Sequence, residues 1–480
     1  MISRGYPWPM TVWLVVCTAA GLALRLLGAR GELWQDEVWT FALLRTVNSP
    51  LGIFLDMSAD NNHFLNTLYL YYVGPDAAPI AQRALSILLG VATIPAVAVA
   101  LRSLPRPAQL FGIAVFALGY PMVHYGSEAR GYAGFILFTV ISFVLVEREL
   151  DAPLPRNRLW LGISNLLGTL FQPIMLGTIA VLIGWTLWTQ WRRDGSIRRA
   201  AAVTQTVFSV TVRLLLIVLI LAVLAVYRVG GYRILNTDAF TPGAIIEGYG
   251  GMLRYLLGLG ESGPEWLVLV VVMVAATVAI YLARHHLGRR ASFYALAMLA
   301  LPAALFCARL PNLVIYRYYL LSSCALLLLL SELFALAWQR GGWMRAFALL
   351  LAGGLAAGNA VELAKLFTDH RGSYEPAIRT IAASATPSVS SNLDGIASTM
   401  IEFHQDRHNL RVDYVHSDSL CKSDAAWLIQ IDNLRSQKPE TLTFGAPGCS
   451  KIYRKHAYYP AWGLSGWEWT LYRRAAGESD

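Results

Sequence analysis

The chain consists of long apolar runs separated by short polar connections. A membrane-spanning helix needs about 20 mostly apolar residues. The first run, residues 8–28, reaches this length and is not followed by a small-residue cleavage site, so we interpret it as an uncleaved first helix. With the later runs, the pattern predicts about eleven spans. The later runs cover residues 79–101, 108–125, 132–147, 158–171, 173–190, 206–227, 266–283, 291–308, 318–338 and 343–364.

Arginines gather in every second connection between these runs. Loops rich in Lys and Arg stay in the cytoplasm, so this alternation predicts a cytoplasmic N-terminus. With an odd number of spans, the polar tail from residue 371 then lies outside the cytoplasm. The clusters are Arg102 with Arg106; Arg148 with Arg156 and Arg158; Arg192, Arg193, Arg198 and Arg199; Arg284, Arg289 and Arg290; and Arg340 with Arg345.

The composition agrees with this membrane interpretation. Of 480 residues, 56% are hydrophobic and 14% are charged, whereas a soluble protein carries roughly a quarter charged residues. The net charge of +9 comes from the inner loops, because the tail 371–480 holds 12 basic and 12 acidic residues. No DNA- or RNA-binding motif is present, which excludes a nucleic-acid partner. We expect an integral protein of a bacterial inner or plasma membrane.

The tail alternates helix-like and strand-like patterns. Residues 374–383 and 396–404 have helical periodicity, whereas the β-branched or aromatic runs are 412–415, 427–431, 467–472 and a short piece around Val389. The sequence therefore predicts an all-α polytopic membrane domain, residues 1–370, followed by a small extracytoplasmic α/β domain, residues 371–480. Cys421 and Cys449 could pair if this domain lies outside.

Two of the outward segments are long. Residues 29–78 contain an amphipathic stretch, 63–73, that is rich in Leu and Tyr and too short to span, so we expect a juxtamembrane helix in the interface. Residues 228–265 contain another short amphipathic piece at 245–259.

Two adjacent carboxylates, Asp36 and Glu37, follow the first span directly and are flanked by Trp34 and Trp39. Placing both at a membrane surface costs desolvation energy, which favours use as a general base or as metal ligands. The alternative is a solvated turn.

Asp60 and His63 belong to the segment that opens the juxtamembrane helix, and they could line a site or bind an acceptor. Asp and Asn also favour helix N-caps, so a purely structural role for this segment stays open.

Glu128, Arg130 and Tyr132 lie at the outer junction of the third and fourth spans. Arginine is costly near hydrocarbon, and its planar guanidinium suits a phosphate group. An ion pair between Glu128 and Arg130 that only anchors the turn is the alternative.

Arg317 and Tyr318 lie at the outer end of the tenth span. An aromatic belt explains the tyrosine, but the positive-inside rule disfavours an outer arginine. Gln172 precedes Pro173 at the outer turn between the fifth and sixth spans, where it lines the site or marks a helix break.

These groups come from different spans but share one face of the membrane. If they converge, they combine a base with a cationic clamp. That combination suits a lipid-linked phosphate donor, with an anionic leaving group, and a hydroxyl or amine acceptor that must lose a proton.

The combination resembles the GT-C superfamily, and within it the protein O-mannosyltransferase and aminoarabinose lipid A transferase type. The resemblance spans roughly residues 10–365. It rests on the Asp36–Glu37 pair in a long first outer loop, Asp60 with His63, the turn from Glu128 through Arg130 to Tyr132, and Arg317 with Tyr318.

The resemblance implies an inverting membrane glycosyltransferase that uses a polyprenyl-phosphate sugar. It makes Asp36 the general base, with Glu37 and Glu128 completing the catalytic group, and it assigns the donor phosphate to Arg130 and Arg317, with Tyr132 and Tyr318 beside them. The implied acceptor is a glycan, lipid or protein. Phe64-Leu65 replaces a family Pro-Pro, and Gln172-Pro173 replaces a His-Tyr pair, which affects the sugar and acceptor geometry.

Three alternatives remain. A lipid-linked glycan polymerase or ligase is the nearest. A transporter of lipid-linked sugars would need ionisable residues deep in the spans, whereas Arg213 and Glu332 lie near inner span ends. A non-catalytic subunit would not need Asp36. We expect no cofactor. Asp36, Glu37 and His63 could hold a divalent cation, but their spacing in the sequence is not that of a typical metal site, so we do not predict one.

Overall fold

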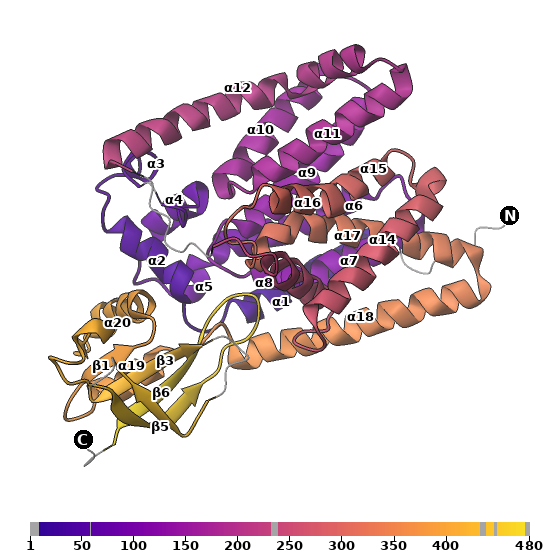
Figure 1. Cartoon of the computed structure of the whole chain (residues 1–480). Coiled ribbons are helices and arrows are strands. Elements are labelled where there is room, and N and C mark those ends of the chain that lie inside the picture. The colour runs from indigo at the N-terminus through magenta and orange to yellow at the C-terminus, as the bar shows by residue number, and fades with distance from the viewer. Residues whose placement is uncertain (1–8, 58, 232–238, 433–437, 446–448, 476–480) are drawn as a thin grey trace. The chain divides into compact units, whose positions relative to one another are not determined.

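The computed structural model describes residues 9–57, 59–231, 239–432, 438–445 and 449–475 (Figure 1). By internal contacts the chain divides into two compact units, some of whose boundaries fall within helices. The helical unit comprises Met1–Leu27, Ser49–Tyr69 and Arg83–Leu363; the mixed unit comprises Gly28–Asn48, Leu70–Gln82 and Ala364–Asp480. That residue 370 marks the end of the membrane domain and the start of an extracytoplasmic domain stays a prediction.

Helices make up the helical unit. They are α1 (Met10–Gly28), α3 (Gly52–Leu55), α4 (Phe64–Val73), α6 (Ala84–Ala100), α7 (Arg106–Leu118), α8 (Tyr120–Tyr125), α9 (Tyr132–Asp151), α10 (Pro155–Phe171), α11 (Met175–Asp194), α12 (Ile197–Val229), α13 (Gly251–Leu256), α14 (Glu265–Leu287), α15 (Arg290–Ala295), α16 (Leu301–Cys307), α17 (Leu320–Arg340) and α18 (Gly342–Asp369). Both predicted amphipathic pieces are helical, the second as a π-helical turn, Ile246–Gly250, that continues into α13.

Local sequence explains the tight turn between α11 and α12. Gly195 ends α11 in the left-handed region, with φ of +68°, which glycine adopts without strain. Ser196 follows, and its hydroxyl accepts a hydrogen bond from the Arg199 backbone N–H as the N-cap of α12. A two-residue connection therefore reverses the chain between two long apolar helices.

Six helical stretches in the described part of the chain are long and apolar enough to cross a membrane. They are Met10–Gly28, Ile197–Val229, Glu265–Leu287, Arg290–Cys307, Tyr316–Arg340 and Gly342–Asp369. Helices α6 and α7 are apolar but shorter, so the number of about eleven spans stays a prediction. The protein is an integral membrane protein.

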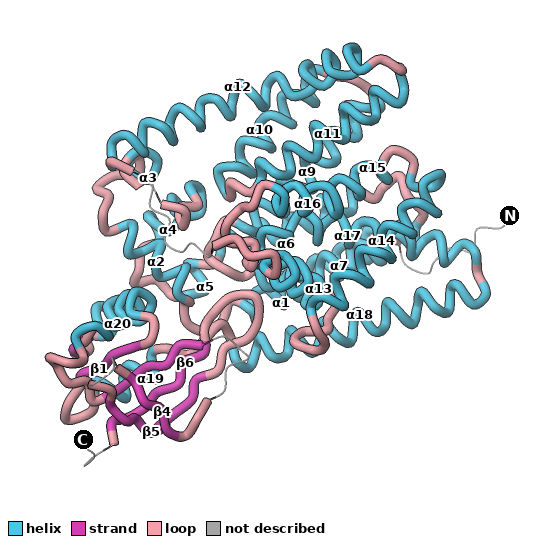
Figure 2. Tube along the Cα trace, in the orientation of Figure 1, coloured by secondary structure: helices cyan, strands magenta, loops and turns pink. Residues whose placement is uncertain are grey.

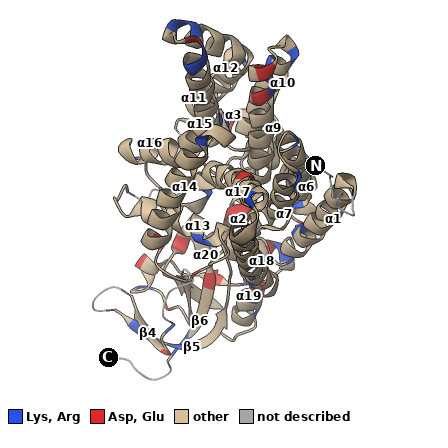
Figure 3. Ribbon diagram, turned by 90° about the vertical axis from the view of Figure 1, so that its right-hand side faces the viewer, with Lys and Arg blue, Asp and Glu red and all other residues tan. Residues whose placement is uncertain are grey.

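The predicted inner and outer connections gather at different ends of α9. Near its C-terminal end, Arg290 donates to Glu147 at 2.6 Å and to the carbonyl of Ala100 at 2.9 Å, which joins three predicted inner connections. Near its N-terminal end, Arg130 meets His63, which joins two predicted outer segments. Figure 3 shows Lys and Arg between α11 and α12, at the helix ends. Which end faces the cytoplasm stays a prediction.

Arg25, whose sequence context does not set it apart from other arginines, connects α1 to α7 and α8. The side chain of Arg25 is buried, and its guanidinium donates to the carbonyls of Gly21, Ala117, Phe116 and Met122 at 3.0 to 3.2 Å. The last carbonyls of a helix have no partner within it. Arg25 therefore satisfies the C-terminal end of α7.

Replacing Arg25 with methionine should destabilise the fold by at least about 3 kcal/mol, because it leaves buried carbonyls without their charged donor. The measurement is the thermal unfolding of purified protein in detergent. Arg102→Met is the matched control, since Arg102 is exposed. Equal melting temperatures for the two variants would contradict this role of Arg25.

The mixed unit contains one sheet of six strands within the described residues, with the order β2-β1-β3-β6-β5-β4 (Figure 2). β1 pairs in parallel with β2 and β3, and the other neighbours are antiparallel. The predicted small α/β domain is therefore confirmed. The strands are β1 (Ser388–Ser391), β2 (Asp413–Tyr414), β3 (Trp427–Asp432), β4 (Thr441–Phe444), β5 (Lys451–Tyr459) and β6 (Glu468–Arg474), and the helices are α2 (Gln35–Leu44), α5 (Pro79–Gln82), α19 (Glu375–Ala382) and α20 (Asp394–His408).

Within this unit, α2 packs against α20, although more than 350 residues separate them in the sequence. The rings of Phe41 and Phe403 stack with centroids 6.0 Å apart, and the Trp39 indole N–H donates to the Thr399 hydroxyl at 3.2 Å. Arg45 adds an ion pair with Asp406 at 2.6 Å. Elsewhere in the unit a disulfide joins Cys421 to Cys449, as predicted.

Candidate functional site

A buried arginine and histidine form the centre of the candidate site in the helical unit. Nε and Nη2 of Arg130 lie 3.1 and 2.7 Å from Nε2 of His63. Nδ1 of the same imidazole lies 3.2 Å from the carbonyl oxygen of Phe171. Residues from the first outer segment, the turn before α9 and the end of α10 therefore meet here, as the sequence predicted for the first two.

The contacts fix the protonation of His63. Because a guanidinium only donates and a carbonyl only accepts, Nε2 accepts from Arg130 while Nδ1–H donates to Phe171. Burial lowers the pKa of His63 to about 4, against the opposing hydrogen bond to the Phe171 carbonyl. His63 is therefore a neutral side chain that orients Arg130 at neutral pH.

A second arginine reaches the same place. The guanidinium carbons of Arg130 and Arg317 lie 5.3 and 5.8 Å from the centroid of the Tyr132 ring. Burial, together with the charge of Arg317 and against the effect of Tyr132, lowers the pKa of Arg130 to about 9. We call His63, Arg130, Tyr132 and Arg317 the arginine cluster. Two buried or partly buried cations beside one ring form a region suited to an anion.

Glu128 moderates this charge. Its carboxylate is buried, 4.0 Å from Nε of Arg130 and 3.9 Å from Nε2 of His124. A separation of 4.0 Å is longer than a hydrogen bond, so the ion pair to Arg130 is looser than the contact to His63. The guanidinium of Arg130 thus lies closer to His63 than to the Glu128 carboxylate.

Side chains from neighbouring helices fix the turn that carries Arg130. The amide of Asn66 donates to the Ala129 carbonyl at 2.7 Å, and the hydroxyl of Ser86 donates to the Arg130 carbonyl at 3.0 Å. Gly131 then passes so close to α10 that a Cβ at this position would lie 1.7 Å from the Phe171 carbonyl oxygen. A residue without a side chain is required here.

Gly131→Ala should therefore displace either the turn or the end of α10, at a cost of about 1–3 kcal/mol, and lower activity through Arg130. Thermal unfolding and transfer rates measure both effects. Gly177→Ala in α11 is the matched control, because its Cβ would make only ordinary contacts at 3.5 Å and longer. A Gly131→Ala protein as stable and active as the control would show that this close approach is wrong.

The other predicted site residues of the helical unit differ in exposure. Gln172 is buried and directly follows Phe171 at the end of α10. Tyr318 is partly exposed, in a 3₁₀ turn (Tyr316–Tyr319) that also carries Arg317. Asp60 is exposed and lies outside α4.

Asp36 and Glu37 occupy the first turn of α2, in the mixed unit, and both side chains are buried. Oε2 of Glu37 accepts a hydrogen bond from the Trp34 backbone N–H at 3.0 Å, the contact by which an acidic residue at the third helical position caps a helix. The structure thus gives Glu37 a capping contact in the first turn of α2.

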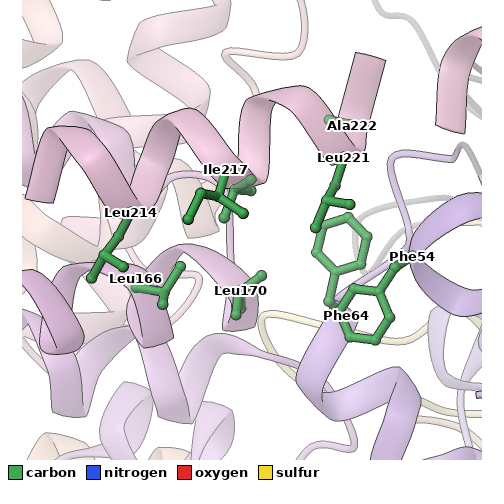
Figure 4. Close-up of a pocket in the computed structure, with 9 residues that line it drawn as sticks. Phe54, Phe64, Leu166, Leu170, Leu214, Ile217, Leu221 and Ala222 are labelled. Atoms are coloured by element: carbon green, nitrogen blue, oxygen red, sulfur yellow. The ribbon is translucent and has the colours of Figure 1, made fainter. Parts of the chain in front are cut away.

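An apolar cavity of about 200 Å³ lies beside the arginine cluster. Figure 4 shows the rings of Phe54 and Phe64 facing the Leu221 side of α12. Two lining residues, Phe64 and Leu170, are chain neighbours of His63 and Phe171. The lining is entirely hydrophobic: Phe54, Phe64, Leu166, Leu170, Leu214, Ile217, Val218, Leu221 and Ala222.

Sequence reasoning missed four contributors to this site. Ser86, His124 and the Phe171 carbonyl carried no signal that separated them from ordinary residues of a span. Asn66 could have been found, because it lies three residues after His63 and so on the same face of a helix.

No protein-family model matches the chain, and no curated protein matches it in sequence. Solved structures do match in fold. The oligosaccharyltransferase of Archaeoglobus fulgidus, tethered to an acceptor peptide, superposes with a TM-score of 0.51 at 12% identity over 88% of this chain and 68% of its own. The oligosaccharyltransferase AglB from the same organism, in complex with an inhibitory peptide and a dolichol-phosphate, gives a TM-score of 0.50 at 11% identity over 88% of this chain and 69% of its own.

The chain has the GT-C fold. ArnT from Cupriavidus metallidurans in the apo state also matches, with a TM-score of 0.49 at 11% identity over 96% of this chain and 98% of its own. The fold shared with the Archaeoglobus fulgidus oligosaccharyltransferase confirms the GT-C resemblance inferred from the outer motifs at the level of the fold. The finer likeness to mannosyl- and aminoarabinosyltransferases stays a prediction.

Proposed function

We propose that this GT-C protein is a membrane glycosyltransferase. It transfers a sugar from a polyprenyl-phosphate donor to a hydroxyl or amine of a glycan, lipid or protein acceptor at the outer face of the membrane. The anomeric carbon is inverted in a single displacement.

The observation that carries the proposal is the arginine cluster next to an apolar cavity. A polyprenyl phosphate has an anionic head and a branched hydrocarbon tail, so it needs a cation and an apolar surface side by side. Phe64 of the cavity and His63 of the cluster are consecutive in the chain, which keeps the two surfaces adjacent. AglB, of the same fold, was solved with a dolichol-phosphate.

The arginines hold the phosphate. Arg130 is oriented by the neutral His63, and Arg317 shares the Tyr132 ring with it. As the bond between the anomeric carbon and the phosphate oxygen breaks, negative charge collects on that oxygen. Two preorganised guanidinium groups in a poorly hydrated site stabilise this charge more than water would.

Asp36 is the general base. Its carboxylate takes the proton of the acceptor hydroxyl or amine while the acceptor atom bonds to the anomeric carbon, and the polyprenyl phosphate leaves as an anion. Glu37 holds the first turn of α2 through the Trp34 N–H. Glu128 tunes the charge around Arg130. Gln172 and Asp60 line the route of the acceptor.

The test uses purified full-length protein in liposomes with a panel of radiolabelled polyprenyl-phosphate sugars, preceded by mass spectrometry of the lipid that copurifies. We expect a copurifying polyprenyl phosphate and radiolabel in a new product. Repeating the transfer assay in the presence of a chelator tests whether the activity needs a divalent cation. Movement of label across the bilayer without a new glycosidic bond would instead indicate a transporter, and use of pyrophosphate-linked glycans alone would indicate a polymerase or ligase.

A further inference from the structure

Three potential metal ligands of the mixed unit face one another, remote in sequence from the proposed transferase residues. His404 and His408 lie one turn apart on α20, so their side chains share one face of the helix. Glu375 opens α19. One ligand atom from each of these three residues lies within 4.8 Å of the other two.

His404 is the member of this group that points most strongly to a metal site. Its side chain is 3% exposed, yet neither Nδ1 nor Nε2 has a hydrogen-bond partner among the described residues. Buried polar groups are normally paired. An imidazole nitrogen without such a partner keeps a lone pair that a metal ion can take.

The carboxylates around His404 are held in place. Oε1 of Glu375 accepts a hydrogen bond from Nε of Arg379 at 2.6 Å, while Oε2 of Glu375 lies 3.2 Å from Nε2 of His408. Oε2 of Glu32 accepts the backbone N–H groups of Tyr374 and Glu375 and lies 3.7 Å from Nε2 of His404. Glu32 therefore stands beside the three ligands as a second carboxylate.

We propose that Glu375, His404 and His408 bind a divalent transition metal of the Zn²⁺ class, with Glu32 next to the open position. Zinc takes imidazole nitrogen and carboxylate oxygen at about 2.0–2.2 Å in a tetrahedron, which sets ligand atoms about 3.4 Å apart. The spacing of 3.2 Å between His408 and Glu375 is close to this value. Mg²⁺ and Ca²⁺ prefer sets made only of oxygen.

The bound ion would tie α19 to α20 beside Glu32. Since Glu32 precedes α2 and α2 packs on α20, the metal would strengthen the attachment of the 28–48 segment to the sheet domain. The site is therefore structural, and it does not depend on the proposed transferase activity.

The experiment uses tag-free full-length protein in detergent, stripped with a chelator, desalted and titrated with ZnCl₂ against a chromophoric competitor. We expect His408→Gln to bind one zinc fewer than the wild type, or to bind it at least about 10-fold more weakly. Zinc should raise the melting temperature of the wild type and not that of this variant. His404→Gln should behave likewise if it folds.

His416→Gln is the matched control, because His416 is an exposed histidine of the same domain that contacts Asp394 and lies outside the cluster. His408 is partly exposed, so His408→Gln should melt like the wild type without zinc. Zinc binding by His408→Gln equal to that of the wild type would overturn the proposal. So would equal binding of Mg²⁺ by the wild-type protein.

Discussion

Replacing Asp36 with asparagine should lower the rate of sugar transfer by about 10²- to 10⁴-fold, the usual contribution of a positioned general base. Asparagine has nearly the same shape but cannot take up a proton. Asp36 lies in the first turn of α2, and the contacts of Phe41 and Trp39 with α20 remain in the variant. The protein should therefore stay folded, and a reconstituted transfer assay measures the loss.

Two further variants make this result specific. Asp56→Asn removes an exposed carboxylate that pairs with Arg228 and should retain the wild-type rate. Glu37→Gln keeps an oxygen for the Trp34 N–H, since Gln caps a helix as Glu does. If Glu37→Gln lost as much activity as Asp36→Asn, Asp36 would not be the only base. If Asp36→Asn kept full activity, Asp36 would not be the base at all.

Arg130→Ala should lower kcat/KM for the donor by roughly 10- to 150-fold, because a hydrogen bond to a charged group contributes about 1.5–3 kcal/mol. Most of the loss should appear for the lipid phosphate and little for the acceptor. Arg130→Lys should recover part of it, since lysine keeps the charge but not the planar fork. Steady-state kinetics with the donor and acceptor varied separately measure the difference.

Arg228→Ala is the control for Arg130, because Arg228 is an exposed arginine paired with Asp56. An unchanged donor KM and rate in Arg130→Ala, with a lowered melting temperature, would assign Arg130 a structural role through His63. That result would favour the alternative in which Arg130 only anchors the turn through its ion pair with Glu128, at a separation of 4.0 Å.

The sequence was sufficient for the class of the protein, and it singled out several residues that the structure brings together. Apolar runs and Arg-rich connections predict a polytopic fold, because the bilayer imposes length and charge rules that a single sequence displays. Outer charges such as Arg130 and Arg317 stand out against those rules. They meet at Tyr132, as expected if outward groups converge.

The sequence was insufficient where a residue acts through a distant partner. Arg25 looks like the last basic residue of an ordinary first span, yet it caps α7, more than 90 residues away. Strands β4 and β5 were missed because neither was distinguished from loop by a sustained hydrophobic alternation, and their order in the sheet depends on pairing with β6. Glu37 and Asp36 are adjacent and chemically alike, and the capping contact of Glu37 with the Trp34 N–H is visible only in the structure.

The pairing of α2 with α20 has a consequence for how the protein is made. Helix α2 leaves the ribosome early, whereas α20 is translated only after the entire helical unit. The helix that carries Asp36 therefore waits through most of synthesis without the partner for Phe41 and Arg45. Contacts of such long sequence separation form late in folding. We expect the proposed base to be the last part of the site to become ordered, so that a chain released before residue 394 would insert its spans and yet remain inactive.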